Sequence, residues 1–140
     1  PVAGETAEVF IPFVTAHHAY ALARAGATDP LEALLATTRQ RAARDDAEAR
    51  EIWVPVGLRV VEAAAAHGRG DLGEVAVLLE PAAARVARVG GSDAQTDLFR
   101  MSYAYALART GRAADAEAYW DEAHAARPEN DLDRTVLNQG

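Results

Sequence analysis

The 140-residue chain is predicted to be all-α, a single domain over residues 1–140 built from about three antiparallel helix pairs and a short C-terminal helix. Its 34 alanines favour helix by intrinsic propensity, and only six prolines and ten glycines interrupt the chain. Three similar strings also recur, at Tyr20–Gly26 (YALARAG), Glu62–Gly68 (EAAAAHG) and Tyr105–Gly111 (YALARTG), with closing glycines 42 and 43 residues apart. Such a period is typical of stacked helical repeats.

The first pair is expected at about residues 8–25 and 30–44. Gly26 suits the left-handed position that ends a helix. Asp29-Pro30 with Glu32 then provides an N-cap, an N1 proline and an N3 acid for the second helix.

The second pair is expected at about residues 48–67 and 72–89, with Asp71 and Glu74 at capping-box spacing. Pro55 lacks a backbone donor and clashes with the preceding turn, so the first of these helices should kink there or begin there. The acid-rich stretch from 44 to 51 is expected to be an exposed connection between the two pairs.

The third pair is expected at residues 93–109 and 113–127, opened by Ser92 with Gln95 and divided at Gly111. A short helix from Leu132 to Leu137 is expected to cap the stack. Solenoids need polar capping units, so an open end would permit a homodimer.

Four residues after Gly111 resemble the second half of a tetratricopeptide repeat: Ala116, Trp120, Ala123 and Pro128. The resemblance implies a right-handed α-α superhelix, a TPR-like solenoid, in which the alanines allow close packing, Trp120 fills the space between units and Pro128 ends the helix. The first half of the repeat departs from the pattern, since Arg100 stands where a large apolar residue is usual.

A longer resemblance begins at Val56-Gly-Leu, passes through Gly68-Arg-Gly-Asp71, and ends on the string Gly90-Gly-Ser-Asp-Ala-Gln-Thr-Asp-Leu-Phe99. Together these segments are similar to the C-terminal part of the tetratricopeptide repeat protein 38 family. Thr15-Ala-His-His18 resembles that family's Asp-Ala-His stretch, with threonine replacing the acid. The similarity covers most of residues 13–130. It implies that the chain is a C-terminal portion of a longer protein, and it implies a helical-repeat fold but no established activity.

In such a stack the first helix of each pair lines a concave face. The glycine register places nine residues there: Phe13, Tyr20, Arg24, Leu58, Glu62, Leu98, Met101, Tyr105 and Arg109. They describe an aromatic and aliphatic floor, two rim arginines and a central carboxylate, which suits a peptide or a partner subunit. Alternatively, the two tyrosines belong to the core and the arginines complement helix dipoles. Ala16 and Tyr20 occupy the positions where a carboxylate clamp needs Lys or Asn, which argues against that mode.

The histidines do not form a metal-binding pattern. His17 and His18 are adjacent, so on a helix they point about 100° apart and cannot share one ion. His17 is expected to be a buried, hydrogen-bonded structural residue or, alternatively, a polar group in a small-molecule pocket. His67 and His124 lie near helix ends and are expected to be dipole partners.

Several functional classes are disfavoured. The chain has no cysteine, which excludes disulfides, thiolate metal sites and a cysteine nucleophile, and it has no Ser-His-Asp order or nucleophile elbow. A net charge of −7 argues against nucleic acid. With no leader-like segment or long apolar run, the default location is the cytoplasm. All fourteen basic residues are arginine, which suggests a GC-rich bacterial source.

The acidic and glycine-rich clusters have structural interpretations. The Gly90–Asp93 turn is not followed by Lys, Arg or Thr at the positions that a phosphate loop uses, and is interpreted as a capping turn. Asp97, after this turn, could pair with an arginine of the preceding helix. The acids are interpreted as solvated surface: Asp45, Asp46, Glu48, Glu51, Asp115, Glu117, Asp121 and Glu122.

The sequence therefore predicts a protein-interaction or scaffolding module that binds a peptide or partner subunit, with no cofactor, metal or catalytic residue. One alternative is a small-ligand or enzymatic domain with a pocket near His17, Tyr20 and Glu62. Another is a helical regulatory segment of a larger bacterial protein. The chain opens on Pro1 rather than methionine, which fits either a processed start or a piece of a larger protein.

Overall fold

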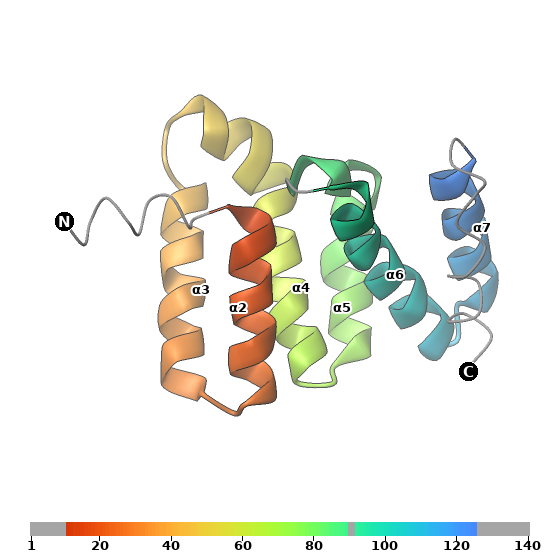
Figure 1. Ribbon diagram of the computed structural model, residues 1–140, viewed down its shortest axis with the longest axis horizontal. Coiled ribbons are helices and arrows are strands. Elements are labelled where there is room, and N and C mark those ends of the chain that lie inside the picture. Colours follow the sequence, from red (N-terminus) through yellow and green to blue (C-terminus); the bar gives the residue numbers. More distant parts are fainter. Residues whose placement is uncertain (1–10, 90–91, 126–140) are drawn as a thin grey trace.

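The computed structural model describes residues 11–89 and 92–125, which form six α-helices and no β-strand. The α-helices are α2 (Pro12–Arg24), α3 (Thr28–Ala42), α4 (Leu58–Gly68), α5 (Leu72–Leu79), α6 (Asp93–Arg109) and α7 (Ala113–His124). A π-helical segment, η1 (Ala49–Gly57), precedes α4, and a 3-10 segment, η2 (Glu80–Val89), follows α5. Figure 1 shows the helices arrayed from the α2/α3 pair at one end to α7 at the other. The predicted all-α class is confirmed.

The first pair begins later than its sequence suggested. Ile11 is extended, with φ −110° and ψ 146°, and α2 starts at Pro12, whose fixed φ suits the first helical position. The predicted N-cap at Asp29 is wrong, because α3 already begins at Thr28 and its N-cap residue, Ala27, offers no side-chain hydrogen bond. Residues 8–10 lie outside the described part of the chain.

The glycines that divide the pairs behave differently from one another. Gly26 and Gly111 have positive φ, at +67° and +87°, as predicted. In the middle pair the positive φ belongs to Gly70, at +79°, whereas Gly68 is the last residue of α4. A Cβ at Gly68 would lie 2.6 Å from the Cβ of Ala23 and 2.7 Å from a backbone carbonyl oxygen of α2. Gly68 therefore permits the close approach of α2 and α4, and the turn itself is made two residues later.

Prolines divide both predicted helices of the second pair. Pro55 lies inside η1, so the predicted helix at 48–67 becomes a π-helical segment followed by α4. This confirms that the helix is irregular at Pro55. The predicted helix at 72–89 remains α-helical only to Leu79, and Pro81 is the second residue of the 3-10 segment that follows. The common cause is the missing backbone donor of proline, which disrupts the regular α-helical hydrogen bonding.

The third pair is the best predicted. Helix α6 has the expected bounds and a complete capping box: Ser92 Oγ accepts from the Gln95 N–H at 3.3 Å, and Gln95 Oε1 accepts from the Ser92 N–H at 2.7 Å. The Asp71 cap of α5 is also confirmed, through the Glu74 N–H at 3.1 Å. Helix α7 ends at His124. Ala125, within the predicted range, is the C-cap of this helix. Residues 126–127, Pro128 and the predicted 132–137 helix lie outside the described residues.

A continuous hydrophobic core joins the helix pairs. Its largest fully buried side chains are Trp53, Val56, Val60, Val61, Val75, Leu79, Val86 and Leu107. Trp120 and Ala116 of α7 are also buried, with 2% and 1% exposure, in agreement with the interior positions expected for them. Buried alanines let neighbouring helices approach closely, as they do between α2 and α4.

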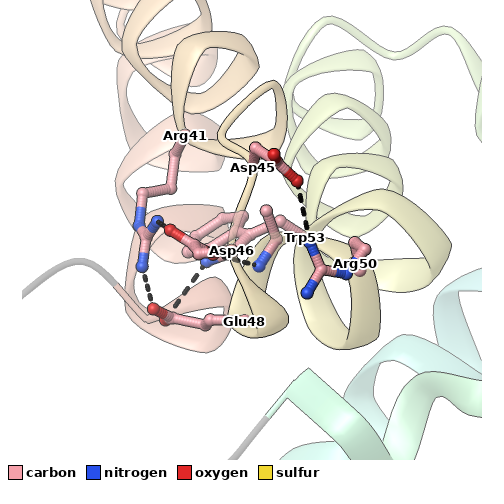
Figure 2. Close-up of polar contacts among 7 residues, drawn as sticks. Arg41, Asp45, Asp46, Glu48, Arg50 and Trp53 are labelled. Atoms are coloured by element: carbon pink, nitrogen blue, oxygen red, sulfur yellow. Dashed lines mark hydrogen bonds and ion pairs between the residues drawn. The ribbon is translucent and has the colours of Figure 1, made fainter.

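An ordered ion-pair cluster connects α3 to η1, and Figure 2 shows its side chains. Arg41 pairs with Asp46 at 3.2 Å and also with Glu48, while Arg50 pairs with Asp45 at 2.9 Å. The prediction of an exposed, solvated acidic connection is thus only partly right. These carboxylates are accessible, but each accepts a bond from Arg41 of α3 or from Arg50 of η1.

The same cluster holds the end of the core in place. The indole Nε1–H of Trp53 donates to Glu48 at 3.3 Å, so a fully buried ring is tied to a surface carboxylate. Asp46 accepts the backbone N–H of Ala49 at 2.7 Å, and this bond is the main reason that the pKa of Asp46 is lowered. We call this region, Arg41 to Trp53, the Trp53 junction.

Candidate functional site

The described chain contains a cavity of about 520 Å³ bounded by α2, α4 and α6, with α5 contributing to its wall. We call it the groove. Its volume lies within the range of about 300–1,000 Å³ found for ligand sites. The groove is lined by Ala16, His17, Tyr20, Val60, Ala63, Ala64, His67, Val75, Leu79, Leu98, Phe99, Met101, Ser102 and Tyr105.

Helical periodicity explains which side chains of α4 reach the groove. Val60, Ala63, Ala64 and His67 follow the i, i+3, i+4, i+7 spacing that forms one helix face. The two alanines are small, so this face is shallow and leaves space between the larger side chains of α2 and α6. The hollow thus follows from an alanine-rich face between two faces that carry larger residues.

Two large apolar side chains of the groove remain open to water. Tyr20 of α2 is 41% exposed and Leu98 of α6 is 44% exposed. Both line the cavity, and both would lose contact with water if a ligand entered. Exposed apolar surface gathered in a concavity is typical of binding sites.

A line of rings crosses the groove at its His67 end. The ring of His67 lies 5.5 Å from that of Tyr20 in a T-shaped contact, and 6.5 Å from that of Tyr105. The guanidinium of Arg109 lies 5.6 Å from the Tyr105 ring centroid, in a cation–π geometry. Residues of α2, α4 and α6 therefore meet around one imidazole.

The charge state of His67 is set by this environment. Burial lowers the pKa of His67 below its ordinary value, and the positive charge of Arg24 lowers it further. The imidazole is consequently neutral at pH 7, with one ring nitrogen able to donate a hydrogen bond and the other able to accept one. The expectation that His67 acts as a charged dipole partner is therefore wrong. The helical spacing from Val60 to His67 is the sequence signal that would have placed it in the groove.

Four of the nine residues predicted for a concave surface do line the groove: Tyr20, Leu98, Met101 and Tyr105. Two more flank it. Arg24 is close enough for its charge to act on His67, and Arg109 lies over the ring of Tyr105.

The other three predicted residues lie elsewhere. Phe13 packs against the core, with its ring 6.1 Å from that of Phe99. Leu58 also packs against the core. Glu62 forms an ion pair with Arg39 of α3 at 3.1 Å and is not among the groove residues, so the expected central carboxylate is not there.

His17 is exposed rather than buried, which corrects the main expectation for this residue. Its Nδ1 lies 3.0 Å from the carbonyl oxygen of Phe13, and its ring lies 4.3 Å from the Phe13 ring. The alternative was that His17 is a polar group in a small-molecule pocket. His17 does line the groove together with Tyr20, although Glu62 does not.

A second polar cluster holds α7 against α6. Asp97 is only 5% exposed and pairs with Arg100 of its own helix at 2.9 Å, so the expected arginine of the preceding helix is not its partner in that bond. His124 stacks on Trp120 with ring centroids 4.1 Å apart, and its Nε2 lies 3.9 Å from Asp97. Burial raises the pKa of nearby Tyr119 to about 12. These contacts serve packing between the two helices.

The described residues hold no group of three His, Asp or Glu side chains placed to bind a metal ion. None of the helices in residues 11–89 and 92–125 is both long and apolar enough to cross a membrane. In the second acidic cluster, Asp115 pairs with Arg112 at 2.8 Å, and the other three acids occupy exposed positions of α7.

Comparisons of the chain with protein-family models, with curated proteins and with solved structures found no match. The groove itself is therefore the basis for a functional proposal.

Proposed function

We propose that this protein is an interaction module, a TPR-like superhelix whose groove binds a peptide segment of a partner protein. The observation that carries the proposal is the convergence of exposed apolar side chains from two helices, Tyr20 of α2 and Leu98 of α6, on one cavity of about 520 Å³. The recurring helix-turn strings and the repeat-like spacing around Trp120 support the superhelical assignment.

A peptide fits this groove because the floor is apolar and buried, while large aromatic side chains stand beside it. Val60, Val75 and Leu79 form a buried apolar floor, which favours insertion of one apolar side chain. Tyr20 and Tyr105 provide large, stiff contact surfaces that lose little rotamer entropy on binding. Anchors of this kind carry most of the binding energy in protein interfaces. We therefore expect an aromatic or aliphatic anchor residue in the bound peptide.

A random dodecapeptide display library selected on the wild-type protein tests this proposal. The enriched peptides should share an apolar anchor, and Leu98→Ala should weaken their binding about tenfold in calorimetry, because a groove contact is worth more than about 1 kcal/mol. Val77→Ala is the matched control, since Val77 is an exposed apolar residue of α5 outside the groove, and it should leave the affinity unchanged. Equal effects of the two substitutions would contradict the assignment of the groove.

A small molecule is the second candidate, supported by the cavity volume and by the polar groups of His17, His67 and Ser102 in its lining. An enzymatic function was expected to use a pocket of His17, Tyr20 and Glu62, but Glu62 pairs with Arg39 and does not line the groove. A thermal-shift screen against a metabolite panel distinguishes the two functions. A melting shift that Leu98→Ala abolishes, together with no enriched peptide, would favour the small molecule.

A further inference from the structure

No acid or arginine lines the groove, and two arginines flank it. Glu62, the acid nearest in sequence to its α4 face, is held by Arg39 on the α3 side. Arg24 and Arg109 stand in the last turns of α2 and α6, beside the ring line that crosses the groove. Two arginines thus stand beside this apolar cavity, in a chain whose net charge is −7.

These two arginines flank the same line of rings. Arg24 lies near enough to His67 to affect its protonation, and Arg109 lies over Tyr105, whose ring is 6.5 Å from that of His67. Within the described part of the chain Arg24 has no ion-pair partner, whereas most of the arginines at the Trp53 junction do. An arginine beside an apolar cavity binds carboxylates well, because its fork of N–H donors matches their geometry.

We propose that the occupant of the groove is an acidic peptide, whose Asp or Glu side chain lies beside His67 between Arg24 and Arg109 while a neighbouring apolar side chain fills the cavity. This inference rests on the proposed function and adds the charge of the ligand to it. The carboxylate would meet two guanidinium groups and an imidazole that is able to donate a hydrogen bond.

The position beside His67 has a consequence for pH. A bound carboxylate favours the protonated imidazole, so binding takes up a proton and the affinity rises as the pH falls from 7.5 towards 5.5. The charged and titratable groups facing His67 are Tyr20 and Arg24 from α2 and Tyr105 from α6, and Arg109 lies over the Tyr105 ring. From α5 the groove receives only Val75 and Leu79, which are uncharged. His17 also lines the groove, so a His67→Gln variant is needed to assign the effect.

The test is a display selection repeated on three proteins: wild type, the double variant Arg24→Glu/Arg109→Glu, and Arg59→Glu. Arg59 is an exposed arginine of α4 that does not line the groove, so its reversal matches the charge change at a different surface. Wild type and Arg59→Glu should enrich Asp or Glu at a fixed spacing from the apolar anchor, and the double variant should enrich Lys or Arg there. Circular dichroism confirms folding, and Arg24→Gln with Arg109→Gln replaces the double reversal if that protein does not fold.

The selected peptide and its Asp→Asn or Glu→Gln counterpart then go into calorimetry from pH 5.5 to 7.5. The acidic peptide should bind about tenfold more tightly, as expected for a charge-assisted contact, and more tightly still at low pH on wild type but not on His67→Gln. Anchored peptides without acid enrichment would overturn this inference and leave the proposed function standing. If acidic peptides are enriched but the pH dependence of their affinity is the same for His67→Gln as for wild type, the placement of the carboxylate beside His67 is overturned. A selection that yields no anchored peptide would instead remove the proposed function.

Discussion

The Trp53 junction and the groove both combine aromatic rings with arginines, yet the fold treats them in opposite ways. At the junction Trp53 is fully buried, and its Nε1–H, Arg41 and Arg50 all meet carboxylates (Figure 2). In the groove Tyr20 remains 41% exposed and Arg24 faces a neutral imidazole instead of an acid. Polar groups at the junction therefore complete the structure, whereas Tyr20 and Arg24 at the groove remain available to a ligand.

The largest expected effect is at the junction. Trp53→Ala should lower the free energy of unfolding by about 3–5 kcal/mol, because it removes a fully buried ring and leaves a cavity. That is a large part of the roughly 5–15 kcal/mol that stabilises a typical domain. Urea denaturation followed by circular dichroism measures the loss. Val54→Ala, at the next residue with 56% exposure, should stay within about 0.5 kcal/mol.

The groove counterpart of that substitution is Tyr20→Ala, which should destabilise the protein less than Trp53→Ala does, since much of the ring already faces water. A loss at Tyr20 as large as the loss at Trp53 would show that Tyr20 is a core residue and is not available to a ligand.

An intermediate effect is expected where α4 meets α2 below the groove. Gly68→Ala should cost about 1–3 kcal/mol, because its Cβ would meet the Cβ of Ala23 at 2.6 Å and backbone must shift. Gly73→Ala in α5 is the control: its nearest neighbour would be 3.8 Å away, so the substitution should stabilise the helix by about 0.5–1 kcal/mol. If both changes were stabilising in thermal denaturation, the close approach of α2 and α4 would not be a structural requirement.

The smallest expected effect concerns His67 in the unliganded protein. Its pKa is lowered in the folded state, so the unfolded chain takes up the proton first as the pH falls below about 6.5. Stability from this residue is therefore complete above that pH and is lost on acidification through the folded-state pKa. Between pH 7.5 and 5.5 the free energy of unfolding should fall more for wild type than for His67→Gln. Parallel pH profiles would show that His67 is not desolvated.

Local sequence signals located the helices well, but they predicted the start of α3 and the end of α5 wrongly. The Ser92 and Asp71 caps were predictable because the interacting residues are only three positions apart. Asp29 looked like an equally good cap, but the helix began before it. Pro81 is a local signal too, since it accompanies the change from α-helix to 3-10 helix.

From the sequence alone follow the helical class, the three helix-turn units and the equivalent places of Tyr20 and Tyr105 in the first and third units, because propensity, capping and periodicity act within a few residues. Tertiary structure alone decided that Glu62 turns to Arg39, that Gly68 serves helix contact rather than the turn, and that His67 is neutral in the groove. Those outcomes depend on which residues of α2, α3 and α6 surround α4. Packing between helices that are distant in sequence sets the charge of the groove, and hence the kind of ligand proposed for it.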